Sequence, residues 1–211
     1  DPQLVFLDVS LTEFSFVGVG REDGKTKGEY SPILYNSNRL TLLQTDTFWL
    51  SETPKVISVG WDAALERICT YAQFEHKETG QKFWVFNTHF DHIGELARIQ
   101  SAKLILQKIK MLNINNFPVI ITGDFNLTPD TAPIKMLQNS YIDVMQKIPG
   151  DAINNGTFTG FDKLSNGEDR IDYIFQKDLK IHNSSHIWLK TSSGHWASDH
   201  HPVQAIFSFN Y

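Results

Sequence analysis

Cysteine is nearly missing from this sequence: Cys69 is the only one among 211 residues. An internal disulfide is therefore excluded, and no disulfide framework holds the fold. No apolar run approaches the ~20 residues that a membrane-spanning helix needs, so we expect no membrane span. Internal repeats, low-complexity tracts and linkers rich in Pro, Gly or Ser are also absent from the sequence, and we expect one domain over residues 1–211.

Positive charge is scarce as well. The chain has 19 Lys plus Arg against 24 Asp plus Glu, a formal net charge of −5 at pH 7, and its pI is near 5.9. This balance excludes a broadly basic coat for nucleic acid, although it allows a local basic patch. With 41% hydrophobic and 20% charged residues, the composition is that of a globular protein with a sizeable core.

Several common catalytic motifs are not found. No Gly-x-Ser-x-Gly sequence supplies the nucleophile of a serine hydrolase. Residues 20–26 place three residues between two glycines where a phosphate-binding P-loop needs four, so we interpret them as a hairpin turn. The pairs His89-x-x-His92 and His200-His201 lack Cys partners and helical i, i+4 spacing, which makes zinc the weaker metal hypothesis.

Short apolar runs predict a strand-rich fold. Two of them, residues 83–86 and 119–121, are apolar throughout, which is typical of strands covered on both faces. Apolar residues at every third or fourth position over 96–112 predict an amphipathic helix, and we expect a shorter helix at 132–137. The order of elements favours an α/β fold with a mixed sheet, two packed sheets with helices outside. The predicted strands are residues 14–19, 32–35, 40–43, 68–74, 83–86, 119–121, 171–175 and 203–209.

Polar clusters follow or interrupt several of these strands. They are residues 87–92, 123–126, 170–173 and 198–202. Strand ends of a packed sheet are rigid and can bring distant residues to one point. Three carboxylates and two imidazoles arriving together would suit a hard divalent cation with an activated water beside it. Asp172 is the most informative, because a carboxylate within an apolar strand needs a partner, and a histidine is the natural one.

Each cluster also has a plainer interpretation. Residues 123–126 would serve as an Asx turn after a strand, and Asp199-His200 as a turn before Pro202. His89 taken alone would be a core histidine with satisfied hydrogen bonds. The four clusters in this order argue for chemistry more strongly than any one of them.

The ordered set resembles a known family. Asn87-x-His89, Gly123-Asp124-Phe125-Asn126, Arg170-Ile171-Asp172-Tyr173 and Ser198-Asp199-His200-x-Pro202 resemble the endonuclease/exonuclease/phosphatase superfamily of deoxyribonuclease-like metallophosphoesterases. Residues 48–54, 60–64 and 87–94 are similar to an uncharacterised, largely bacterial branch. The resemblance implies a four-layer α/β sandwich, in which two mixed β-sheets pack face to face with helices outside.

The resemblance also implies catalytic roles. Asp124 would orient or deprotonate the attacking water, and Asn126 would hold that water or a phosphate oxygen. His200 would contact the scissile phosphate, with its tautomer and charge state set by Asp172. His89 would stabilise charge on the pentavalent phosphorus, a general need of phosphoryl transfer.

Metal and substrate ligands follow from the same resemblance. Asp199 would lie at a Mg²⁺ or Mn²⁺ ion together with Asp124. Asn87 would support His89, and Arg67 matches a phosphate-binding position, although a surface charge opening a strand explains it equally well. Independently of the resemblance, Trp61 and Trp196 lie next to the motif segments, where they would stack on a base or sugar ring or else anchor loops.

One departure concerns the N-terminus. The family opens with a strand carrying an Asn and a later strand ending in Gln-Glu, whose Glu binds the metal. Residues 2–9 resemble that second strand without its Gln-Glu. Either Asp8 replaces the missing metal ligand, or the full protein has further N-terminal residues, which is the explanation we favour.

The leading hypothesis is a Mg²⁺- or Mn²⁺-dependent phosphoesterase whose substrate is a small phosphorylated metabolite or a short nucleic acid. The acidic pI argues against tight non-specific duplex binding. A binding or scaffold protein without turnover is the alternative, and a zinc enzyme centred on His89 and His92 is a third hypothesis.

Overall fold

The computed structural model describes residues 2–147, 156–162, 164, 165, 167 and 169–210. Its centre is a six-stranded mixed sheet of order β3-β4-β5-β6-β8-β7. β5 and β6 run parallel, whereas their neighbours pair antiparallel. The strands of this sheet are β3 (Leu40–Trp49), β4 (Ile68–His76), β5 (Lys82–His89), β6 (Val119–Asp124), β7 (Ile142–Asp143) and β8 (Asp172–Lys177).

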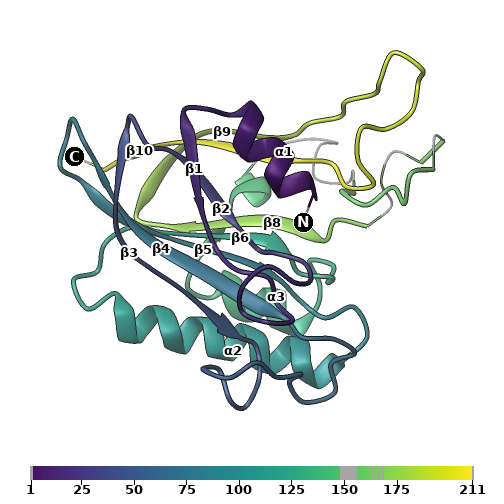
Figure 1. Cartoon of the computed structure of the whole chain (residues 1–211), viewed down its shortest axis with the longest axis horizontal. Coiled ribbons are helices and arrows are strands. Elements are labelled where there is room, and N and C mark those ends of the chain that lie inside the picture. The colour runs from purple at the N-terminus through teal and green to yellow at the C-terminus, as the bar shows by residue number, and fades with distance from the viewer. Residues whose placement is uncertain (1, 148–155, 163, 166, 168, 211) are drawn as a thin grey trace.

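Helices cover one face of this sheet (Figure 1). α2 (Glu95–Leu112) connects β5 to the parallel strand β6, and α3 (Ala132–Gln138) and the short 3-10 helix η1 (Val144–Lys147) follow β6. Trp84 and Phe86 of β5 point into the core beneath the helices, together with Ile105 of α2. Burial of this large apolar surface is the main favourable term in folding.

The other face carries two separate antiparallel pairs. β1 (Phe14–Val17) pairs with β2 (Ile33–Asn36), and β9 (Leu179–His186) pairs with β10 (Val203–Phe209). Phe83 and Val85 of β5 pack into the smaller core on this side. β5 is therefore covered on both faces, as its uninterrupted apolar run predicts.

These layers confirm the expected α/β sandwich. α1 (Pro2–Ser10) lies beside β1, on the opposite side of the six-stranded sheet from α2 and α3 (Figure 1). Within the described residues the second layer consists of two two-stranded antiparallel sheets rather than one mixed sheet. Among the helices of that part of the chain, none is both long and apolar enough to cross a membrane.

All eight strands predicted from the apolar runs and both predicted helices are present, most of them with shifted ends. β3 continues six residues past the predicted end to Trp49, because the polar side chains of residues 44–47 face outward or lie at the sheet edge. β9 escaped prediction since its sequence LKIHNSSH has no apolar run. The prediction of a strand at residues 2–9 is wrong: these residues form α1. A short apolar run fits a helix or a strand equally well by periodicity alone.

Gly123 allows β5 and β6 to approach at their carboxyl ends. Its φ is +145°, and a Cβ there would lie 1.9 Å from the carbonyl oxygen of Thr88. No other residue fits this backbone conformation without moving the neighbouring strand.

We predict that Gly123→Ala lowers the free energy of unfolding by at least about 3 kcal/mol, since it combines backbone strain with a steric clash. Urea denaturation measures this loss. Gly80→Ala is the matched control, because Gly80 has φ +69° in a turn with nothing within 4 Å of an added Cβ. It should lose only about 1 kcal/mol from the left-handed backbone. Equal losses for the two variants would show that the β5–β6 contact is not the reason.

Candidate active site

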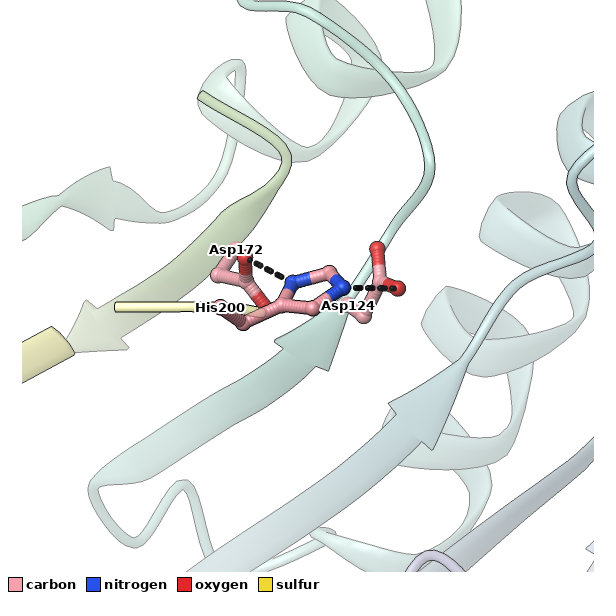
Figure 2. A group of neighbouring side chains, drawn as sticks. All are labelled: Asp124, Asp172 and His200. Atoms are coloured by element: carbon pink, nitrogen blue, oxygen red, sulfur yellow. Dashed lines mark hydrogen bonds and ion pairs between the residues drawn. The ribbon is translucent and has the colours of Figure 1, made fainter. Parts of the chain in front are cut away.

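Three neighbouring strands bring their polar residues to the same edge of the sheet. His89 ends β5, Asp124 ends β6 and Asp172 begins the antiparallel strand β8. In the sheet register His89 pairs with Asp124, and Asp124 pairs with Asp172. His200 reaches the same place from the loop before β10 (Figure 2). The tertiary structure therefore gathers residues that are up to 111 positions apart in the sequence.

Asp172 and His200 form a hydrogen-bonded pair, as the sequence predicts. The Nδ1 of His200 lies 2.8 Å from Oδ2 of Asp172, and its Nε2 lies 4.0 Å from Oδ2 of Asp124 (Figure 2). Burial by itself lowers the pKa of His200, but the hydrogen bond and the negative charges of Asp172 and Asp124 outweigh it and raise the pKa. The imidazole is thus oriented by one carboxylate and directed toward the other.

The surroundings of Asp124 disfavour its ionised form. Burial and the nearby charge of Asp172 raise its pKa to about 6, although the backbone N–H of Asn126 donates a hydrogen bond to Oδ1 at 2.8 Å. A cation beside the two carboxylates would stabilise their ionised forms and lower the pKa of Asp124.

Asp124, Asp172 and His200 each offer a ligand atom within 4.8 Å of the others. They line an open hollow at the strand ends. Carboxylate oxygens are the ligands that Mg²⁺ and Mn²⁺ prefer, and one or two carboxylates suffice when water and substrate complete the coordination. The donor set therefore fits the predicted metal.

His89 touches the cluster from the other side. Its Nε2 lies 3.3 Å from Oδ2 of Asp124, and its Nδ1 lies 3.6 Å from Glu29. Burial together with the positive charges of Arg67 and Arg21 lowers the pKa of His89 to about 3. At neutral pH the ring is therefore uncharged, and its contact with Asp124 is that of a neutral imidazole rather than an ion pair.

Glu29 is a neighbour of the site that the sequence interpretation missed. It lies near the end of the turn at residues 20–30, where Gly20 and Tyr30 form an isolated β-bridge, consistent with the expected turn. No local pattern marks Glu29, because its proximity to His89 depends on how the turn lies over the sheet.

Two asparagines hold the strand ends in place. Asn126 has a left-handed backbone (φ +50°), and its Nδ2 donates to the carbonyl of Phe90 at 3.0 Å. Asn87 donates to the carbonyl of Pro32 at 2.8 Å and accepts a hydrogen bond from Thr122 at 2.9 Å. These contacts of Asn87 join β5 to β6 and to the segment before β2, and the predicted support of His89 stays a prediction.

Arg67 is buried, and its interpretation as a surface charge is wrong. Its side chain is 5% exposed, with Nε 3.2 Å from Asp91 and Nη2 3.0 Å from Nδ1 of His92. Within the part of the chain that the structure describes, the grouping with metal-ligand spacing is the Asp124 cluster. The zinc hypothesis centred on His89 and His92 finds no support among the described residues, since neither histidine is in that group and His92 contacts Arg67 instead.

Other predicted residues lie outside this cluster. Asp199 is adjacent to His200 and its charge acts on it, but its carboxylate is not in the group of ligand atoms. Asp8 is exposed on α1 and is not in that group. Trp196 is 7% exposed and donates its indole N–H to two backbone carbonyls, so its prediction as a stacking surface is wrong. Trp61 is half-buried with φ +49°, and its backbone N–H donates to Glu52.

Thr157 connects, through hydrogen bonds, the segments of the chain that carry Asp172 and His200. Its Oγ1 accepts the backbone N–H groups of Ile171 and Asp172 at 3.0 and 3.1 Å, and its carbonyl accepts the N–H of His201 at 2.7 Å. Thr157 is fully buried. The side chain and the backbone carbonyl of this one residue therefore link the start of β8 to the histidine loop.

The raised pKa of Asp124 has a consequence for stability. When the pKa of a carboxyl is higher in the folded than in the unfolded state, the folded protein loses stability as the pH rises from about 4 to about 6. We predict that Asp124→Asn, which cannot ionise, is more stable than the original chain at pH 8 in EDTA by about 1–3 kcal/mol. The difference should vanish near pH 4.

Denaturant unfolding at both pH values measures this difference. Asp46→Asn serves as the control, because Asp46 is exposed on β3, and it should change stability little at either pH. If Asp124→Asn were less stable than the original chain at pH 8, the prediction that the ionised Asp124 destabilises the fold would be contradicted.

Comparison with known proteins agrees with this geometry. A sequence model of the Endonuclease/Exonuclease/phosphatase family matches residues 17–200. A mannosyl-6-phosphatase from Bacteroides thetaiotaomicron is 38% identical with a TM-score of 0.90, covering 98% of this chain and 81% of that chain. Another family protein from the same organism is 37% identical with a TM-score of 0.91, covering 99% and 80%.

A further relative has no described activity. An uncharacterised protein of Acanthamoeba polyphaga mimivirus is 32% identical over 191 residues, which is 83% of this chain and 69% of that protein. The family match spans most of the chain and includes every residue of the cluster. This chain therefore belongs to the endonuclease/exonuclease/phosphatase family, whose members are hydrolases that act on phosphoesters.

Proposed function

We propose that this chain is a Mg²⁺- or Mn²⁺-dependent phosphoesterase that hydrolyses its substrate by in-line attack of an activated water. The observation that carries the proposal is the convergence of Asp124, Asp172 and His200 at one edge of the sheet, each with a ligand atom within 4.8 Å of the others. A divalent ion bound there would neutralise charge on the phosphoryl group.

Each side chain of the site has its own role in the proposed reaction. Asp124, with Oδ1 held by the N–H of Asn126, orients the water or takes its proton. His200, fixed by Asp172, contacts the phosphoryl group through Nε2. His89 is neutral, so it offers a hydrogen bond without adding a charge. Together these groups place donors around the phosphoryl oxygens where negative charge develops.

The substrate is a small phosphorylated metabolite in this proposal. The similarity to a mannosyl-6-phosphatase at 38% identity supports a phosphomonoester of sugar size. The net charge of −5 argues in the same direction, because tight binding of long DNA requires several neutralised phosphates.

The test is hydrolysis of p-nitrophenyl phosphate and bis-p-nitrophenyl phosphate with Mg²⁺, with Mn²⁺ and with EDTA. We expect activity that requires the metal and falls about 100-fold or more in Asp124→Ala and His200→Ala. His182→Ala is the control, because His182 is exposed on β9, and it should keep its activity. Activity that survives both substitutions would refute the assignment. A chain that hydrolyses no phosphoester would favour a binding protein without turnover.

The role of Thr157 gives a second prediction. Thr157→Val keeps the shape of the side chain and removes the acceptor for Ile171 and Asp172. We expect kcat to fall about 10-fold while KM changes little, since the His200–Asp172 pair loses its alignment. The limb of the pH profile that reports His200 should move to lower pH, because a weaker Asp172 hydrogen bond raises its pKa less.

Thr157→Ser retains Oγ and should restore both the rate and the pH profile. A loss of stability in Thr157→Val with an unchanged pH profile would assign Thr157 to the fold alone.

A further inference from the structure

A second hollow lies at the end of the main sheet opposite the Asp124 cluster, and we call it the distal hollow. It is lined by the end of α2, the segment before β6, the residues before β7 and the turn between β8 and β9. Val119 in its lining begins β6, whereas Asp124 ends that strand, so about 17 Å of extended chain separates the two places. Its volume of about 580 Å³ lies in the range of pockets that hold small organic molecules.

The inner wall of the distal hollow is apolar. Ile109 of α2 and Val119 of β6 line it as members of the main core, and Leu106 and Phe117 pack against that core from partly buried positions. Ile114, which is 77% exposed, adds an apolar side chain to the same lining. Because covering apolar surface removes it from contact with water, this wall favours an occupant with an apolar body.

Tyr141 contributes a hydroxyl group with no partner. The residue lines the hollow and is 8% exposed, and its phenol forms no hydrogen bond within the described part of the chain. Burial and the negative charge of Asp178 raise the pKa of Tyr141 to about 12, so the phenol is protonated at neutral pH and can donate. Since polar groups in buried residues are normally hydrogen-bonded, an acceptor atom inside the hollow would supply what the fold does not.

The rim of the distal hollow is positively charged, although the whole chain is acidic. Lys110 and Lys177 are exposed in the lining, against one carboxylate, that of Asp178. Neither lysine forms an ion pair with another described residue. Lys110 lies in the last turn of α2, where its charge also offsets the partial negative charge of the helix end. Two cations and one anion leave a local charge of +1, which matches a monoanion such as a carboxylate.

We propose that the distal hollow binds a small organic monoanion, an apolar ring bearing one carboxylate, held by Lys110, Lys177 and Tyr141. The ammonium and phenol groups donate to the carboxylate oxygens, and such charge-assisted hydrogen bonds are stronger than neutral ones. The ring packs against the apolar wall that Phe117 and Val119 provide. This site is separate from the proposed active site, and it does not depend on the proposed function.

The test compares three probes that share one ring system. They are 2-naphthoate, the neutral 2-naphthamide and 2-naphthylmethylamine, which is a cation at pH 7. Titration in EDTA, followed by backbone amide chemical shifts, reports affinity and location together. We expect 2-naphthoate to shift the amides of Phe117, Tyr141 and Lys177 and to bind about 10-fold more tightly than 2-naphthamide, since only the anion makes charge-assisted contacts. The amine should bind more weakly than either.

Matched variants identify the groups that hold the carboxylate. In Lys177→Gln we expect 2-naphthoate to bind about 5- to 20-fold more weakly, and in Tyr141→Phe about 3- to 10-fold more weakly, as the loss of one hydrogen bond predicts. Lys103→Gln is the control: Lys103 is an exposed lysine of α2 two turns before Lys110 and is not part of the lining. Asp124→Ala should also leave the binding unchanged. The amide spectrum of each variant shows whether it is folded.

Three outcomes would overturn the proposal. One is that 2-naphthoate shifts none of the amides around the distal hollow at the limit of its solubility. Another is that 2-naphthamide or the amine binds as tightly as 2-naphthoate. The third is that the folded Lys177→Gln and Tyr141→Phe variants bind 2-naphthoate as the original chain does, or that its binding is lost in Asp124→Ala. A chain that hydrolyses no phosphoester would leave the proposal standing, because these measurements involve no turnover.

Discussion

The antiparallel pairing of β6 with β8 sets the carboxylates of Asp124 and Asp172 side by side at a partly buried end of the main sheet. Burial, together with the like charge of Asp172, raises the pKa of Asp124 to about 6. His200 lies between them, and its hydrogen bond to Asp172 compensates only part of the repulsion. A cation placed beside the two carboxylates would therefore stabilise their ionised forms.

Rigid backbone maintains that arrangement against its own repulsion. Gly123 lets β5 and β6 close together, and the left-handed Asn126 turns its N–H back onto Asp124. Thr157 links the start of β8 to the histidine loop. A site on packed strand ends keeps its geometry more accurately than one on mobile loops, as phosphoryl transfer requires.

His89 connects two environments of different chemistry. On one side lies the carboxylate of Asp124, and on the other lie the buried guanidinium groups of Arg67 and Arg21, whose positive charges lower the pKa of His89.

Much of the architecture follows from the sequence alone: the alternation of strands with the long helix, the burial of β5 on both faces, and the four polar clusters that identify the family and predict His89, Asp124, Asp172 and His200 as one site. These features are local patterns of periodicity and residue type, which a linear chain records directly. The tertiary structure decided the rest. α1 is a helix, Trp196 is an anchor, Arg67 is buried, and Arg21 and Glu29 lie beside His89. Burial and proximity depend on which distant segments cover a residue, and no local pattern carries that information.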